Sequence, residues 1–328
     1  MNNSAILGIT NKQMRCPLAG AAKAVMMVEG AAMIIIGTEE CTFYTKVSLS
    51  MHGEGSRCHS FVLNNHDVTF GCSERVAQVI EQVISTYKPN SLFLITTCVV
   101  EIIGEDYTSV ALEAEEKYKI PVNVIQTCHF KGNNGEHGLA LVKNAAAPFA
   151  KLPSITGLMM QRLKLKWRKQ KRINDTSLSN ISPLNYRMGL LHTLVSNPDT
   201  LVLEYGTAGT TAYAIKALKM IHGIDTSNRL FTTGMGENEI VMGSTTRLEN
   251  ALKTLDKAYS PKAIFVLSTA VSEVTGIDVK GVCHYMQDEV KTKLISCTGH
   301  AYGGNFEAGV EAANKIIGTE LMTQKCLL

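Results

Sequence analysis

The sequence predicts an α/β protein with two Rossmann-like, parallel-sheet domains that are related by internal duplication. Two observations indicate this fold. Short apolar runs alternate along the chain with helical patterns, and the segment Asp67–Asp106 recurs without a gap as Glu239–Asp278. These two segments are identical at about a quarter of their positions. Alternating helices and strands of this kind favour parallel sheets with right-handed crossover connections.

The elements of the first half follow from their patterns of apolar residues. The segment Glu74–Tyr87 is a predicted amphipathic helix, because its valines and isoleucines recur at helical spacing. The segment Ser91–Thr96 is a short apolar run, which is typical of a strand covered on both faces. In chain order we expect a helix over Leu18–Glu29, a strand over Ala32–Ile36, these two elements, a helix over Tyr107–Lys119 and a strand over Pro121–Gln126.

The repeat extends beyond its central block. Four matching blocks in the same order favour a duplication over chance. We therefore expect a first domain over 1–150, a basic and polar linker over 151–180, and a degenerate second copy over 181–328. The linker is either a solvated helix or a docking surface for an acidic partner. The three outer matches pair Ile34–Thr45 with Leu203–Ala214, Cys16-Pro17-Leu18 with Ser182-Pro183-Leu184, and Thr127-Cys128-His129 with Thr298-Gly299-His300.

The composition excludes several classes of protein. The chain has 328 residues, of which 45% are apolar and 19% charged, as in ordinary globular proteins. Its net charge of +3 is too small to indicate a nucleic-acid partner. No stretch of membrane-spanning length is free of charge, and the first residues lack the pattern of a signal peptide. We therefore expect a cytoplasmic protein without a membrane partner, whose nine cysteines stay reduced.

Three of these cysteines fall where a parallel sheet places its ligand site. Cys41 and Cys98 each follow an expected strand, and ligands collect at the carboxyl ends of such strands. Cys16 precedes a helix start of small residues, including Gly20, which allows close approach of a large inorganic group. Thiolates from three separate loops suit a cubane iron–sulfur cluster better than zinc, whose cysteine ligands usually come in close pairs. Buried structural cysteines are the alternative.

The second copy strengthens the cluster hypothesis. It keeps the scaffold but carries Ser182, Thr210 and Ala270 at the positions that match the three cysteines. Cysteines that only filled a core would have little reason to differ together. We therefore expect one cluster per chain, held by the first half and covered by the second.

Four motifs of the first half resemble the N-terminal domain of the nitrogenase component 1 family. The most specific is T-T-C-V-V-E-I-I-G-E-D over Thr96–Asp106; the others are C-P-L-A-G at Cys16, G-T-E-E-C-T-F-Y around Cys41 and F-G-C at Phe70. The family includes the molybdenum–iron protein subunits, their cofactor-assembly homologues and the catalytic subunits of dark-operative protochlorophyllide reductase. The spacings of 25 and 57 residues between the three cysteines are similar to those of its beta-type subunits.

The resemblance implies a specific chemistry. Cys16, Cys41 and Cys98 match the ligands of an oxygen-sensitive electron-relay cluster, a [4Fe-4S] centre, and we predict that Gly20 and Thr97 contact it. The family takes electrons from a homodimeric iron protein with a P-loop ATPase site, and no P-loop motif occurs in this chain. The expected function is the iron–sulfur component of a two-component, ATP-dependent reductase, an oxidoreductase.

Two other functions stay open at this point. The family's later domains, which help to enclose its substrates, have no counterpart here, and this favours the alternative of a metal-cofactor assembly scaffold or carrier without reductase activity. A regulatory binding module without a cluster is the third reading. A homo-oligomer is also expected, since symmetric assembly is common.

Several further residues are candidates for supporting roles. The fourth cluster ligand is Cys72, Glu40, or a group from the second half or a second chain. The histidines that follow the last strand of each half, His129 and His300, are candidate proton donors, or else helix caps or surface residues. The remaining expectations are a flexible or substrate-facing loop carrying His52, Cys58, His59 and His66, hydrogen-bonding roles in the fold for Glu101 and Glu273, and no role for Cys283 and Cys326.

Overall fold

The computed structural model describes residues 16–50, 55–150, 185–299 and 303–321. It contains two four-stranded sheets, with strand orders β2-β1-β3-β4 and β6-β5-β7-β8. Every pair of neighbouring strands in both sheets is parallel, and this confirms the predicted fold class. The two orders are the same when the strands of each half are numbered from its start, as expected of a repeat.

Helices separate the strands in both halves. The first half comprises α1 (Pro17–Val25), β1 (Ala31–Gly37), α2 (Glu39–Ser50), η1 (Gly55–Arg57), β2 (Cys58–Val62), α3 (Asn65–Phe70), α4 (Ser73–Tyr87), β3 (Ser91–Thr96), α5 (Cys98–Ile102), α6 (Thr108–Tyr118), β4 (Val122–Gln126) and α7 (Gly135–Ala146). The second half comprises α9 (Tyr186–Leu194), β5 (Thr200–Tyr205), α10 (Ala208–His222), β6 (Leu230–Thr232), α11 (Glu237–Met242), α12 (Thr246–Tyr259), β7 (Ala263–Ser268), α13 (Ala270–Val274), α14 (Val279–Met286), η3 (Gln287–Glu289), β8 (Lys293–Cys297) and α15 (Phe306–Leu321).

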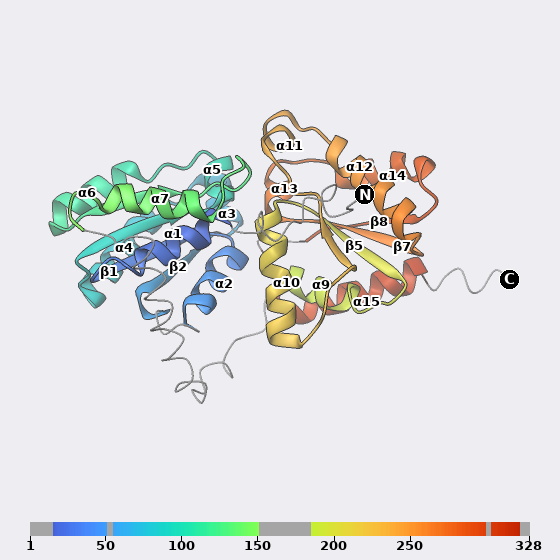
Figure 1. Ribbon diagram of the computed structural model, residues 1–328, viewed down its shortest axis with the longest axis horizontal. Helices are drawn as coiled ribbons and strands as arrows, with labels where there is room; N and C mark the ends of the chain where they lie inside the picture. The colour runs from blue at the N-terminus through green and yellow to red at the C-terminus, as the bar shows by residue number, and fades with distance from the viewer. Residues whose placement is uncertain (1–15, 51–54, 151–184, 300–302, 322–328) are drawn as a thin grey trace.

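The two sheets lie side by side, and helices of the two halves meet between them (Figure 1). Helix α10 packs against α2, and α13 packs against α5. Two buried hydrophobic clusters each draw residues from both halves. Alternate residues of β1 enter different clusters, Ile34 and Ile36 one of them and Met33 and Ile35 the other, because successive side chains of a strand point to opposite faces. Both faces of the first sheet are therefore covered.

One segment differs from its expected conformation. Cys58 and His59 lie in β2, an edge strand paired with β1, and not in a flexible loop. The Cys58 side chain is fully buried, so it packs in the core and does not face a substrate. His52 lies outside the described residues. The predicted linker and the domain boundaries at 150 and 181 also fall at or within undescribed residues, and they stay predictions.

Glycines set the distance between the first helix of each half and the helix that covers it. A Cβ atom on Gly20 would lie 1.8 Å from the Gly135 carbonyl oxygen of α7, and one on Gly189 would lie 2.0 Å from the Phe306 carbonyl oxygen of α15. A Cβ on Gly138 would likewise lie 1.9 Å from the carbonyl oxygen of Pro17. Backbone contact at these distances requires glycine.

These contacts also determine which residues of the halves correspond. Gly138 meets Pro17, the first residue of α1, whereas Gly309 meets Tyr186, the first residue of α9. The residue before each helix is therefore the true pair, and Cys16 corresponds to Asn185. The sequence alignment instead predicted Ser182, which lies outside the described residues.

Replacing Gly20 by alanine is expected to lower the free energy of unfolding by about 1–3 kcal/mol, because the added methyl group overlaps the backbone of α7. Urea unfolding followed by circular dichroism would measure this loss. Gly318→Ala is the matched control, since nothing lies within 4 Å of its would-be Cβ and alanine favours a helix. Equal stability of the two variants would contradict the close contact.

No helix among the described residues has the length and apolar character needed to cross a membrane.

Candidate metal centre

Three cysteines from distant parts of the first half line one cavity. Cys16 immediately precedes α1, Cys41 lies in the first turn of α2, and Cys98 is the first residue of α5. Strands β1 and β3, which lead into α2 and α5, are parallel neighbours, so both helices start at the same edge of the sheet. Helix N-termini carry unpaired N–H groups and a partial positive charge, which favour thiolates and anionic clusters. The structure thus brings together the three thiols that the sequence predicts as ligands.

The second half closes the cavity. Its contribution comes from the starts of α10 and α13, whose N-termini also face this space. A Cβ atom on Gly209 would lie only 3.4 Å from the Cys16 sulfur, so the second half approaches the thiol closely at this point. The Tyr213 hydroxyl is hydrogen-bonded to the Thr45 hydroxyl of α2 at 3.4 Å. The second-half lining consists of Thr207, Gly209, Thr210, Tyr213, Ala270 and Val271.

Two of the thiols are electrostatically unfavourable as isolated anions. Burial, followed by the neighbouring Cys98 and Cys41, raises the pKa of Cys16 well above its usual value. Burial and the neighbouring Cys98 raise the pKa of Cys41 to about 12. Each thiolate would therefore repel the others across the cavity that all three line. A centre of iron cations would supply the positive charge that such thiolates need.

Cys98 has a different environment. Its pKa is lowered, chiefly because the Cys128 thiol donates a hydrogen bond to its sulfur, and burial opposes this effect. Backbone N–H groups of His129 and Phe130 also donate to it, the first at an N–S distance of 3.2 Å. This bond to Cys98 raises the pKa of Cys128, so Cys128 stays a protonated donor. Sequence reasoning missed this role, because no spacing rule links Cys128 to the other cysteines.

The donor set fits a cluster better than a single ion. Among the described residues, no three histidine, cysteine or acidic side chains lie close enough together to hold one metal ion. A cubane binds each thiolate through a different iron, so its ligands stand farther apart than those around one ion. Three cysteine thiols that line one cavity are the donor type that iron–sulfur clusters take.

The other predicted site residues divide into two groups. Thr97 and His129 line the cavity, and the Thr97 hydroxyl is buried without a hydrogen-bond partner. The Thr97 side chain also packs on Gly37, where a Cβ atom would lie 2.1 Å from its oxygen. Gly20 is not part of the lining; its contact with α7 accounts for its small size. His300 lies outside the described residues, as does Cys326.

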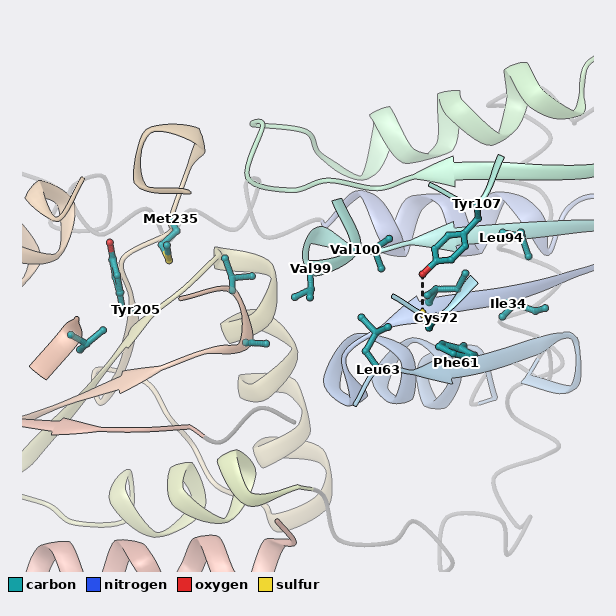
Figure 2. Packing of buried hydrophobic residues seen from close by; sticks show 14 of the residues in the cluster. Ile34, Phe61, Leu63, Cys72, Leu94, Val99, Val100, Tyr107, Tyr205 and Met235 are labelled. Atoms are coloured by element: carbon teal, nitrogen blue, oxygen red, sulfur yellow. Dashed lines mark hydrogen bonds between the residues drawn. The ribbon is translucent and has the colours of Figure 1, made fainter. Parts of the chain in front are cut away.

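The two suggested fourth ligands do not line the cavity either. Cys72 lies in a hydrophobic core beside Phe61, and its sulfur is hydrogen-bonded to the Tyr107 hydroxyl at 3.1 Å (Figure 2). The Glu40 carboxylate is 2% exposed and points into a polar network with the second half. Cys72 therefore packs in the hydrophobic core, and Glu40 takes part in an ion pair, instead of facing the cavity.

This network joins the halves beside the cavity. Asn185 donates from Nδ2 to Glu40 Oε1 at 2.8 Å. The fully buried Arg187 donates from Nε to Glu204 Oε1 at 2.7 Å, and its Nη1 lies 3.5 Å from Glu40 Oε1. A buried arginine between two carboxylates cannot be read from sequence spacing, because Glu40 and Arg187 meet only when the halves dock. We name the three charged residues of this network, Glu40, Arg187 and Glu204, the Arg187 triad.

Two acidic residues of the repeated segment, Glu101 and Glu273, form an ion pair and a hydrogen bond, respectively. Glu101 forms an ion pair with Lys131, and Glu273 accepts a hydrogen bond from the Ser268 hydroxyl at 2.7 Å. Both contacts agree with roles in maintaining the loops after β3 and β7.

Comparison with known proteins finds the same family that the sequence motifs resemble. The model of the nitrogenase component 1 type oxidoreductase family matches residues 16–174 and 188–326. The iron–molybdenum cofactor biosynthesis protein NifE of Methanosarcina barkeri is 31% identical over 124 residues, or 37% of this chain and 27% of that protein. NifE of Clostridium pasteurianum is 32% identical over 126 residues, with the same two shares.

A nitrogenase subunit also matches. The nitrogenase molybdenum–iron protein alpha chain of M. barkeri is 26% identical over 139 residues, or 40% of this chain and 26% of that protein. The matched segments thus span about a quarter of the length of these relatives. Because the family model covers both halves, the chain belongs to the nitrogenase component 1 type oxidoreductase family.

Proposed function

We propose that this chain holds one [4Fe-4S] cluster on Cys16, Cys41 and Cys98 and serves as a scaffold or carrier in metal-cofactor assembly. The observation that carries the proposal is the convergence of the three thiols, each at a helix start, on one cavity that the second half closes. The assembly role is supported by the similarity to NifE proteins, which are named for cofactor biosynthesis.

The chain's own residues suit the retention of such a cluster. When bound, the cluster supplies one-electron redox chemistry. The N–H groups of His129 and Phe130 and the thiol of Cys128 donate to Cys98, and hydrogen bonds to ligand sulfurs tune the potential and stability of a cluster. The second half covers the other side of the cavity and presents hydroxyl groups of Thr207, Thr210 and Tyr213, which are candidates for the fourth ligand.

A second candidate function is that of a reductase component fed by a nitrogenase-type iron protein. Helix α5 favours it, because this helix runs from Cys98 at the cavity to Ile102 at a surface hollow, a rise of roughly 6 Å. The hollow is lined by α3, the end of α5 and α13, and the exposed Phe70 ends α3. A partner docked there would lie within a short electron-transfer distance of the cluster.

An anaerobic assay separates the two functions. The purified protein, reconstituted with iron and sulfide, would be incubated with a nitrogenase-type iron protein, ATP and dithionite. One set of reactions would contain an apo iron–sulfur acceptor, and another a panel of unsaturated substrates that includes a tetrapyrrole. We expect cluster transfer to the acceptor without a reduced product. ATP-dependent product without transfer would favour the reductase, and a protein that binds no iron would end both proposals.

A further inference from the structure

One histidine side chain lies beside the Cys16 thiol at the cavity. A Cβ atom on Gly209 would lie 3.4 Å from the Cys16 sulfur and 3.6 Å from Nδ1 of His129. The sulfur and the nitrogen are therefore no farther apart than the sum of these two distances, and both residues line the cavity. The missing side chain of Gly209 leaves this shared point free. An imidazole nitrogen and a predicted ligand thiol thus approach the same part of the site.

The backbone of His129 is fixed at the cavity. Its N–H group donates to the Cys98 sulfur at 3.2 Å. Its carbonyl oxygen accepts the N–H group of Gly132 at 3.1 Å, and the side chain of Asn133 donates to the carbonyl oxygen of Cys128 at 3.0 Å. The residues that follow β4 therefore form a tight turn, and the imidazole extends from a defined position next to the predicted ligands.

Most hydroxyl groups of the cavity lining have other partners. Thr207 and Thr210 are hydrogen-bonded to each other at 3.1 Å, and Tyr213 is hydrogen-bonded to Thr45 at 3.4 Å. The Thr127 hydroxyl donates to a backbone carbonyl oxygen of β3 at 2.6 Å. A hydroxyl also binds iron well only after it loses its proton, whereas a neutral imidazole suits iron and replaces cysteine in some clusters. The imidazole is therefore the stronger candidate among the donors that complete the lining.

Charge also favours a neutral fourth ligand. Three thiolates already give a [4Fe-4S] cluster a net negative charge, and no lysine or arginine belongs to the described lining of the cavity. A deprotonated hydroxyl, such as that of Thr97, which has no hydrogen-bond partner, would add further negative charge to a site that the second half closes. Burying charge without a partner is costly. An imidazole completes the ligand set without adding charge.

We propose that the imidazole of His129 binds the fourth iron of the cubane, so that the first half supplies three cysteines and one histidine as ligands. The inference rests on the proposed function, because it names a further ligand of the same cluster. The hydroxyls of the second half then cover the cluster without binding it. Histidine in place of cysteine raises the reduction potential of iron–sulfur centres, so the wild-type cluster should have a higher potential than one with four cysteine ligands.

Pulsed electron paramagnetic resonance of the wild-type protein tests the proposal without an activity assay. The protein would be produced with histidine labelled with nitrogen-15 in the imidazole ring alone, reconstituted anaerobically and reduced with dithionite. We expect the coupling of a directly bound nitrogen that changes with the label, in a protein that holds about four irons per chain. A reduced cubane without this coupling would overturn the inference and leave the proposed function standing. A protein that binds no iron would overturn the proposed function, and the inference with it.

Two variants of His129 and one matched control complete the test. His129→Ala should lose the coupling and, on oxidation with ferricyanide, release a ferrous ion to leave about three irons per chain, because the fourth iron has no protein ligand. His129→Cys should keep about four irons, lose the coupling and have a lower reduction potential. His137→Ala, which changes an exposed histidine of α7, should retain the wild-type spectrum. A labelled coupling that persists in His129→Cys would refute the assignment, and this variant and the wild-type spectrum decide the matter even if His129→Ala does not fold.

Discussion

Replacing Cys98 by serine is expected to reduce bound iron and sulfide to background after anaerobic reconstitution. A serine hydroxyl is a far weaker iron ligand than a thiolate, and Cys98 is the ligand whose anion the protein stabilises most, through Cys128 and two backbone N–H groups. Iron and sulfide analysis, together with the brown absorbance of the cluster, would measure the loss. Cys16→Ser and Cys41→Ser should give the same result, since each would remove one of three thiols from the same cavity.

The control for these variants is a cysteine away from the cavity. Cys283 is buried in α14 and does not line the site, so Cys283→Ala should retain the iron of wild type. If Cys98→Ser kept a full complement of iron and sulfide, the assignment of the three ligands would be refuted.

Replacing Arg187 by methionine is expected to lower the free energy of unfolding of the apoprotein by about 3–5 kcal/mol. The substitution would leave two carboxylates, Glu40 and Glu204, in a dry interior without a cation, and removing one partner of a buried ion pair carries that cost. Urea unfolding at pH 7, followed by circular dichroism, would measure it.

Two controls separate charge from packing in this experiment. The triple variant E40Q/R187M/E204Q removes every charge of the Arg187 triad and should regain much of the lost stability. Lys117→Ala breaks the exposed pair with Glu81 and should change little, because water and salt screen surface pairs. If the Arg187→Met protein had the same free energy of unfolding as wild type, the triad would not hold the halves together.

Much of the fold could be predicted from the sequence, for a physical reason. A strand buried on both faces shows as a continuous apolar run, and Ser91–Thr96 has the predicted bounds in the structure. Edge strand β2 was missed because only part of it is buried and its sequence, C-H-S-F-V, mixes polar and apolar residues. Helix α2 was missed because its residues E-E-C-T-F-Y-T-K-V-S-L-S lack a clear apolar stripe.

The candidate site was predictable only in part. The thiols could be located because they follow strands of one parallel sheet, and that topology brings them to one edge. The alignment of Cys16 with Ser182 was wrong by three residues, since a shared Pro-Leu pair outweighed the helix-packing glycines that fix the register. The Cys128 donor and the Arg187 triad depend on tertiary contacts between distant segments, and no local pattern announces such contacts.

Because the chain's own second half closes the cavity, diluting the protein should not uncover it. Because both walls belong to one polypeptide, their encounter is governed by an effective concentration and not by the amount of protein in solution. A thiol site shared between separate subunits would open as those subunits dissociate, whereas this one keeps its cover at any concentration at which the chain stays folded.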